Sequence, residues 1–414
     1  MDEALGKVGP AQEAERILAL DALRGLGVLG ILLMNIQSFS SIAAAYVNPT
    51  ADRPLAGSDL WMWLISELTA DEKFMAIFSM LFGAGIVLLT SRIEARGSKP
   101  TPIFLRRSGW LGVFGVLHAY LLWSGDILFT YAACGLLVYP FRRWPPRRLL
   151  AFGLLVVALG SGLSIMTGWS LQFWPREQVT AFEHQVWRPT PEQAAAEVAA
   201  YRSGWRGEMR ARVPDAIANE TTVFLFYSLW RAAGLMLVGM ALYKWGVITA
   251  LRSTSFYVRC LIAGFAIGAP LILYGAWRDI EERWTLQGSF FYGAQFNYWG
   301  SLGISLAWIS LVMLWCRASA WQRAMGRLAA VGRMAFSNYI FETVICTTIF
   351  YGHGLGQFER MNRVEEGVIV LVVWLTVFVF SQVWMRRFYF GPLEWLWRSL
   401  TYMEREPFLR AWRK

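Results

Sequence analysis

Long apolar stretches separated by short polar segments dominate the chain from residue 17 to residue 390. A membrane-spanning helix needs about 20 mostly apolar residues, because it crosses about 30 Å of hydrocarbon at about 1.5 Å per residue. The stretches are continuous, whereas the strands of a membrane barrel would alternate apolar and polar positions. The pattern therefore predicts about ten transmembrane helices, at 17–40, 74–91, 104–124, 127–141, 149–169, 221–243, 256–276, 297–316, 334–351 and 366–385.

The polar segments give the domain organisation. Residues 1–16 are predicted to form a cytoplasmic N-terminal segment, 17–390 the transmembrane bundle, and 391–414 a cytoplasmic tail along the inner membrane surface. Residues 170–218 are rich in proline and mix both charges, which predicts an extracytoplasmic excursion whose residues 191–212 form a surface helix. The expected fold class is all-α, a polytopic membrane helix bundle.

The composition is typical of a protein embedded in lipid, and the distribution of charge predicts its orientation in the membrane. Hydrophobic residues make up 56% of the chain and charged residues 16%, against about 25% charged in soluble domains. The formal charge of +10 lies in loops, which favours topology determinants over a nucleic-acid surface. The basic loops place both termini in the cytoplasm. We expect a multi-pass protein of the cytoplasmic (inner) membrane. Its partner is the lipid bilayer and not nucleic acid, and the sequence leaves open whether it forms a homodimer.

Ionisable groups inside spans are costly in lipid, so each one is a candidate site. Asp21 and Arg24 share a helix face at the cytoplasmic end of the first span. They form a structural ion pair or contact the phosphate of a ligand. Arg231 lies near the middle of the sixth span, where it faces either a functional site or a polar interior.

The ninth span carries a polar stripe. Arg333, Ser337, Asn338 and Glu342 recur at three- to five-residue intervals, which places them toward the core of the bundle. Hydrogen bonds between helices explain Ser337 and Asn338 equally well.

Other polar residues gather at the outer end. Asn35 lies toward the outer end of the first span, Lys73 at the mouth of the second, and His353 after the ninth. His118 lies about two turns below the outer end of the third span, and Asp126 follows in a tight turn.

A histidine beside a carboxylate is the usual general base near neutral pH. His118 and Asp126 are eight residues apart, about 12 Å along a continuous helix. A direct contact therefore requires the chain to fold back after Gly125.

Several motifs, in order along residues 16–407, together resemble those of the YeiB-like family of membrane proteins. The C-terminal part of that family is a domain of unknown function. The motifs are L-D-A-L-R-G-L at 20–26, M-N-I at 34–36, F-S-M-L-F-G-A-G at 78–85, G-V-L-H at 115–118, L-W-S-G-D-I-L at 122–128, G-R-M-A at 332–335, S-N-Y at 337–339, F-Y-G at 350–352 and G-P-L-E-W at 391–395.

The first-span motif is also similar to that of wider membrane acyltransferase families, including heparan-α-glucosaminide N-acetyltransferase. In the bacterial enzymes of that group an arginine on the first span is followed by a histidine. Here Arg24 is followed by Asn35, which shifts the expected base to His118. The resemblance implies a cytoplasmic acyl-CoA donor such as acetyl-CoA, no metal, and an extracytoplasmic acceptor such as a glycan, lipid or small molecule.

On this hypothesis His118 is the base and Asp126 orients it. Asn35 or Lys73 binds the developing oxyanion. The donor site comprises Asp21, Arg24 and Arg333. The candidates for binding the acceptor are Asn35, Lys73, Arg231, Asn338, Glu342 and His353.

Two other classes stay open. A transporter or exporter of a small amphiphilic solute would use Arg231 and the polar stripe of the ninth span as its pathway, although no internal repeat supports it. A non-catalytic membrane partner has no positive support. The sequence contains no P-loop, nucleophile elbow or metal-ligand cluster.

Overall fold

The computed structural model describes residues 17–410, and within them the chain is built of helices. The only extended pairing in this part of the chain is a single bridge between Phe388 and Leu409. The all-α prediction is therefore confirmed. The predicted N-terminal segment 1–16 and the tail residues 411–414 lie outside the described residues.

The helices follow one another with short connections. Two π-helical segments, at 219–228 and 286–293, run directly into α11 and α13. The helices are α1 (Leu18–Ser40), α2 (Ala43–Val47), α3 (Gly57–Thr69), α4 (Lys73–Ala95), α5 (Pro100–Leu121), α6 (Leu128–Val138), α7 (Pro146–Ser170), α8 (Arg176–Val186), α9 (Pro191–Arg202), α10 (Trp205–Ala218), α11 (Leu229–Lys244), α12 (Thr254–Glu281), α13 (Ala294–Arg317), α14 (Gln322–Arg333), α15 (Ala335–Phe350), α16 (Arg363–Arg387) and α17 (Pro392–Tyr402).

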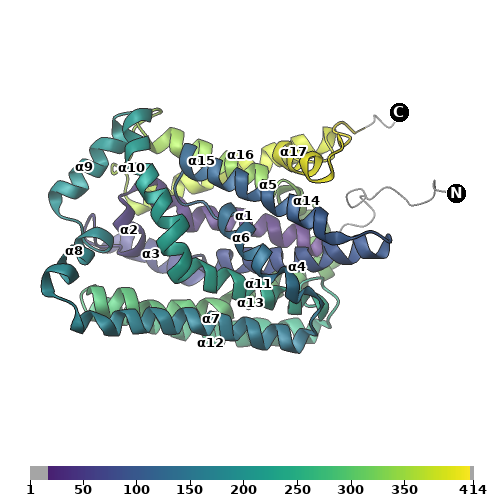
Figure 1. The fold of residues 1–414 in the computed structure, drawn as a ribbon, viewed down its shortest axis with the longest axis horizontal. Coiled ribbons are helices and arrows are strands. Elements are labelled where there is room, and N and C mark those ends of the chain that lie inside the picture. Colours follow the sequence, from purple (N-terminus) through teal and green to yellow (C-terminus); the bar gives the residue numbers. More distant parts are fainter. Residues whose placement is uncertain (1–16, 411–414) are drawn as a thin grey trace.

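The long helices run roughly along one direction, which gives the bundle two ends (Figure 1). The helices α8 and α9 lie at one end, and α14 and α17 lie at the other. The start of α1 also lies at the α17 end, because Leu20 and Trp397 line one cavity there. The described chain therefore starts and finishes at the same end of the bundle.

Seven helical segments among the described residues are long and apolar enough to cross a membrane. The segments of α5 and α6 are not among them, and α15 is a shorter apolar helix. A multi-pass membrane bundle follows from these helices. The count of ten spans and the cytoplasmic position of the termini stay predictions.

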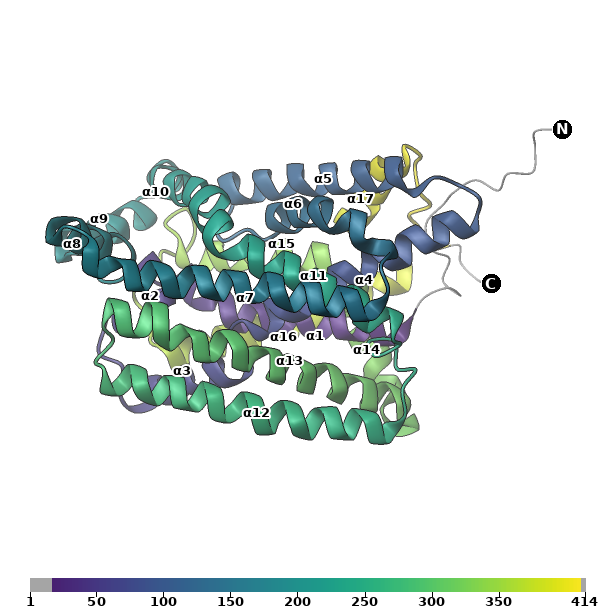
Figure 2. The ribbon, with the colours of Figure 1, turned by 60° about the horizontal axis from the view of Figure 1, so that its bottom comes forward.

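The outer helices bury one face and expose the other. On α7, Val157 is fully buried, whereas Leu155 and Leu159 are 53% and 50% exposed. The paired helices α12 and α13 lie along one side of the bundle (Figure 2), and Ile262 on α12 is 62% exposed. Large apolar side chains exposed in rows fit hydrocarbon better than water.

Glycines bring the inner helices into close contact. A Cβ on Gly83 of α4 would lie 1.9 Å from the carbonyl oxygen of Met236, and one on Gly239 of α11 would lie 1.9 Å from that of Met80. No side chain fits in either place, so α4 and α11 pack backbone to backbone. This contact is the physical reason for the glycine in the F-S-M-L-F-G motif.

The prediction of one surface helix over 191–212 is wrong. The helix breaks between α9 and α10 at Gly204, whose φ is +89°, a value that favours glycine. The side chains of Glu208 and Arg212 are also buried rather than on a surface. The excursion contributes polar groups to the bundle because α10 continues inward toward α11.

The C-terminal tail packs against the bundle. Its helix α17 packs on α5, where the indole N–H of Trp397 donates to the carbonyl oxygen of Arg107 at 2.9 Å. The guanidinium of Arg107 lies 3.6 Å from the centre of the Trp397 ring. The tail is thereby fixed to the bundle at its arginine-rich end.

Candidate functional site

His118 and Asp126 are in direct contact. The Nδ1 atom of His118 lies 2.8 Å from Oδ1 of Asp126, and both side chains are 1% exposed. The contact requires the fold-back that the sequence left open: α5 ends at Leu121, and the chain reverses before α6 begins at Leu128. The second carboxylate oxygen accepts from the backbone N–H of Phe129 at 2.8 Å. Asp126 is therefore held at both oxygens.

Small residues make this fold-back sterically feasible. A Cβ on Gly115, one turn before His118, would lie 2.3 Å from the backbone nitrogen of Phe129 and 2.8 Å from Oδ2 of Asp126. A Cβ on Gly125 would lie 2.3 Å from the indole ring of Trp123. The two glycines let α6 begin directly against α5, which brings the carboxylate onto the imidazole.

The structure adds a third member, Thr343 of α15, that the sequence analysis missed. Its hydroxyl oxygen lies 3.0 Å from Nε2 of His118, on the other side of the ring from Asp126. The residue is 1% exposed. A threonine inside an apolar helix most often bonds its own backbone, so the sequence carried no signal for this contact across 225 residues.

Aromatic rings pack against the imidazole. The ring of Trp123 is 6.2 Å from that of His118 and 4.3 Å from that of Phe39. Asn35 lies one turn before Phe39 on α1 and is buried. The buried indole N–H of Trp123 has no hydrogen-bond partner among residues 17–410. A donor for a ligand thus lies on an element that covers the histidine.

A cavity of about 310 Å³ opens at the α17 end and extends toward these residues. Its walls contain all three residues predicted for the donor site, Asp21, Arg24 and Arg333. Its inner part is apolar and reaches Tyr339, whose ring centre is 5.0 Å from that of His118. The cavity therefore connects the predicted donor residues with the edge of the histidine site.

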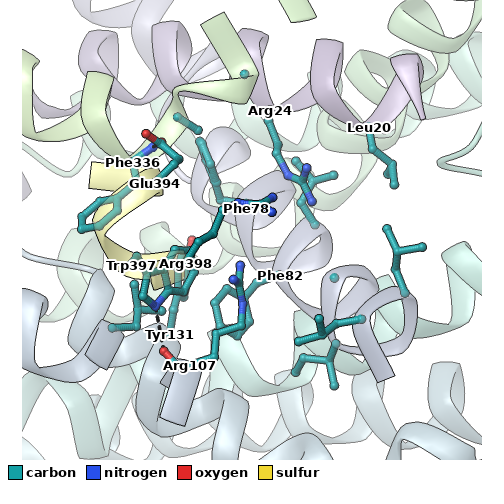
Figure 3. Close-up of a pocket in the computed structure, with 18 of the residues that line it drawn as sticks. Leu20, Arg24, Phe78, Phe82, Arg107, Tyr131, Phe336, Glu394, Trp397 and Arg398 are labelled. Atoms are coloured by element: carbon teal, nitrogen blue, oxygen red, sulfur yellow. Dashed lines mark hydrogen bonds between the residues drawn. The ribbon is translucent and has the colours of Figure 1, made fainter. Parts of the chain in front are cut away.

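Further arginines line the same cavity. Figure 3 shows the side chains of Arg24, Arg107 and Arg398 converging from α1, α5 and α17. Arg24 donates to Asp21 at 2.9 Å, so the predicted ion pair exists within the cavity wall. The sequence predicts Arg24 and Arg333 at one donor site but does not add Arg107 or Arg398 to it, because the helices that carry them lie far apart in the chain. The lining arginines are Arg24, Arg92, Arg96, Arg107, Arg333 and Arg398.

The carboxylate of Glu394 on α17 joins the cavity wall to the start of α15. It accepts from the backbone N–H groups of Phe336 at 2.7 Å and Ser337 at 3.1 Å, and from the Ser337 hydroxyl. These are groups at the N-terminus of α15, which lack partners within the helix. Burial raises the pKa of the Glu394 carboxyl, and the hydrogen bonds from Ser337 oppose that shift.

The residues of the polar stripe of the ninth span have different surroundings in the structure. Asn338 donates to Ser381 at 2.9 Å and to the carbonyl oxygen of Val331 at 3.1 Å, which are contacts between helices. Glu342, next to Thr343, is 2% exposed, and its Oε1 has no partner among the described residues.

Lys73 and Arg231 belong to a separate buried cluster. The ammonium of Lys73 donates to Asn297 at 2.6 Å and to the backbone of Glu67. Arg231 pairs with Glu72 at 3.0 Å and donates to Ser301. These partners pair both cations with groups on neighbouring helices, although Nε of Arg231 has no hydrogen-bond partner among the described residues. The cluster therefore links helices within the bundle.

His353 belongs to another cluster of charged side chains that links helices. Its Nδ1 is 2.8 Å from Oε2 of Glu208, and Arg212 lies 3.3 Å from the same oxygen. Arg212 also donates to the carbonyl oxygen of Leu121, at the end of α5. The structure thus pairs His118 with Asp126, places the predicted donor residues in a cavity that reaches the neighbouring Tyr339, and gives His353 a partner of its own.

Comparison with known proteins agrees with the sequence motifs. A family model described as "Protein of unknown function (DUF418)" matches residues 242–404. The chain is 32% identical over 404 residues to "Uncharacterized protein YeiB" of Escherichia coli (strain K12), and the match covers 94% of this chain and 96% of the relative. The chain belongs to the YeiB-like family. The predicted resemblance to that family is confirmed.

Two further relatives extend the YeiB-like family across other bacteria. "Uncharacterized protein YxaH" of Bacillus subtilis (strain 168) is 27% identical over 429 residues, covering 97% of this chain and 98% of the relative. "Uncharacterized 39.9 kDa protein in amylase 3'region" of Bacillus acidopullulyticus is 26% identical over 404 residues, and the match covers 95% of this chain and 96% of the relative. No solved structure matches the chain.

Proposed function

We propose that this YeiB-like protein is a membrane acyltransferase that moves an acyl group from cytoplasmic acyl-CoA to an extracytoplasmic hydroxyl or amine. The observation that supports it is the arginine-lined cavity that ends beside the buried His118–Asp126 pair. A donor with an anionic head and a reactive tail fits this arrangement. The acyl group would be delivered to the base from the side where the arginines lie.

The mouth of the cavity suits phosphates. Guanidinium groups bind phosphate oxygens through paired, charge-assisted hydrogen bonds, and arginine remains charged in partly buried sites. Arg24 and Arg107 reach the cavity from two helices, and Arg333 reaches it from the end of a third. Several anionic oxygens on one ligand, as in the nucleotide part of coenzyme A, would satisfy them together.

The distance along the bundle from the arginines to the level of His118 suits the pantetheine arm of coenzyme A. The eleven residues from Arg24 to Asn35 on α1, and the eleven from Arg107 to His118 on α5, each rise about 16 Å. Apolar residues line the path between these levels, among them Val28 and Ile31. An extended pantetheine arm held by its phosphates would reach the level of His118 with its thioester.

The chemistry at that level follows from His118. A carboxylate such as Asp126 only accepts, so Nδ1 of His118 keeps its proton and donates it in a hydrogen bond, and the lone pair of Nε2 can accept another proton. An imidazole in this state is a general base for a hydroxyl or amine. The buried Asn35 carboxamide on α1 is the proposed donor to the oxyanion that forms.

Binding and transfer can be measured separately. Purified protein with labelled acetyl-CoA should bind it, and Arg24→Ala and Arg333→Ala should each weaken binding about tenfold or more, since one charge-assisted contact is worth about 1.5–3 kcal/mol. Arg259→Ala on the exposed start of α12 is the matched control and should bind normally. His118→Ala should bind acetyl-CoA and lose transfer to a mixture of envelope glycans. Absence of acyl-CoA binding would refute the acyltransferase proposal.

A second candidate, export of a small amphiphile, is favoured by one observation. The Glu342 carboxyl is buried without a hydrogen-bond partner for Oε1 among residues 17–410, and such acids in membranes commonly carry protons in transporters. Uptake or release of labelled acyl-CoA or a lysolipid by vesicles containing the protein, abolished by Glu342→Gln and independent of His118, would support this candidate over acyl transfer.

A further inference from the structure

We propose that Thr343 is the nucleophile of the transfer, so that the acyl group passes through a covalent acyl-threonine within the membrane. This inference rests on the acyltransferase function proposed above. It starts from the order of three side chains: Asp126 at 2.8 Å from one nitrogen of His118, and the Thr343 hydroxyl at 3.0 Å from the other. Carboxylate, imidazole and hydroxyl in this order are the arrangement that activates a hydroxyl nucleophile.

The hydrogen bonds favour activation of the hydroxyl. Because Asp126 accepts a hydrogen bond from Nδ1–H of His118, Nε2 is an acceptor to which the Thr343 hydroxyl can donate. The competing acceptor is the carbonyl oxygen of Tyr339 at 3.1 Å, the usual bond of a threonine to its own helix. The hydroxyl has a single proton, and the imidazole is the group that can remove it.

Burial protects the intermediate. The side chains of His118 and Asp126 are 1% exposed and Thr343 is 1% exposed, and the rings of Trp123 and Tyr339 pack against that of His118. An ester formed there is shielded from hydrolysis, because the site excludes water.

The donor cavity approaches Thr343 along its own helix. Tyr339 lines the cavity and lies one helical turn before Thr343 on the same face of α15. A thioester at the inner end of the cavity therefore lies next to the turn that carries the hydroxyl.

The reaction has two balanced halves. In the first, the Thr343 oxygen attacks the thioester carbonyl, His118 takes the hydroxyl proton, the carbon–sulfur bond breaks, and the thiolate leaves as CoA with that proton. In the second, His118 deprotonates the acceptor hydroxyl or amine, which attacks the threonine ester. The ester bond breaks, and Thr343 recovers its proton from His118.

A covalent intermediate also fits a transfer between two sides of a membrane. The donor enters by the α17 end, whereas the acceptor is expected at the opposite end. With the acyl group held on Thr343, the two substrates need not occupy the bundle together.

The test needs no knowledge of the acceptor. Purified protein is incubated with acetyl-CoA and isotopically labelled free CoA, without acceptor. A covalent intermediate predicts exchange of label into acetyl-CoA, together with an acetyl group on the peptide that contains Thr343. Thr343→Val should abolish both, and Thr343→Ser should keep both. Thr347→Val, one turn further along α15, is the matched control and should exchange normally.

The outcomes separate the two proposals. Acetyl-CoA binding by each variant checks its folding. If the protein binds and transfers acetyl groups but shows no exchange, and Thr343→Val still transfers, then the acyl-threonine is refuted and direct transfer by His118 stands. If acetyl-CoA does not bind at all, the acyltransferase function and the acyl-threonine both fail.

Discussion

The carboxylate of Glu394 lies across the N-terminus of α15 and accepts from the backbone N–H and the hydroxyl of Ser337. Through this bond the last helix of the chain fixes the start of the helix that carries Thr343. Glu394 also lines the cavity, as Figure 3 shows for it and Trp397. One residue therefore links the wall of the proposed donor site with the orientation of the proposed nucleophile.

Replacing Glu394 should destabilise the bundle. Glu394→Ala leaves the N–H groups of Phe336 and Ser337 without an acceptor, and loss of such a helix cap costs about 1–2 kcal/mol. We expect a lower midpoint in thermal unfolding in detergent and weaker binding of acetyl-CoA. Glu177→Ala, on the exposed surface of α8, should change neither. Equal midpoints for the two variants would contradict this role.

Gly115 should be required for the contact between His118 and Asp126. A methyl group at Gly115 would lie 2.8 Å from Oδ2 of Asp126, so Gly115→Ala should separate α5 from α6 and lower acetyl transfer at least tenfold. Gly109 is on the same helix and has open space around its Cα. Gly109→Ala therefore tests helix propensity alone and should leave transfer unchanged. The initial rates of acetyl transfer by the two variants are compared after each variant has been shown to bind acetyl-CoA equally well. Equal rates would contradict the role of Gly115.

His353 should act on stability rather than on the donor. His353→Ala leaves Oε2 of the buried Glu208 with fewer partners, which costs about 1–3 kcal/mol. We expect a lower unfolding midpoint with unchanged binding of acetyl-CoA. His184→Ala serves as the control, because Nδ1 of this half-buried histidine pairs with a backbone carbonyl oxygen, that of Arg188, rather than with a buried carboxylate. A stable His353→Ala protein that loses transfer would instead indicate that His353 binds the acceptor.

Glu197 should make stability depend on pH. Burial raises the pKa of this carboxyl to about 7, and it accepts from the backbone N–H of Ala43 at 2.8 Å. In the unfolded chain a glutamate titrates near 4.3, so the unfolded state loses its proton first as pH rises. The free energy of unfolding should therefore fall between about pH 4.5 and pH 7 and then level off.

The comparison with Glu197→Gln isolates this contribution, since other buried carboxyls titrate as well. Glutamine keeps an oxygen acceptor for Ala43 and cannot ionise. From pH 5 to pH 8 the unfolding midpoint of Glu197→Gln should rise relative to that of the parent protein, because only the parent carries the ionising carboxyl. A constant difference would show that Glu197 does not titrate in this range.

The amino-acid sequence by itself determined the class of the fold and the positions of its apolar helices. Uninterrupted apolar stretches leave few alternatives to helices in lipid, because every backbone polar group must find a partner within its own segment. The stretch predicted at 17–40 is α1 at Leu18–Ser40, and that at 256–276 lies within α12. The motifs likewise indicated the YeiB-like family.

Only the tertiary structure decided which polar residues meet. The contact of His118 with Asp126 depends on a turn whose direction is set by packing against Trp123. Thr343 reaches the same imidazole from 225 residues away, a relationship that hydropathy and local spacing do not encode. Lys73 was a candidate for the oxyanion, but its hydrogen bonds go to Asn297 and Glu67. A residue's depth in the membrane follows from sequence, whereas the direction in which its side chain points is fixed by how the helices rotate and pack.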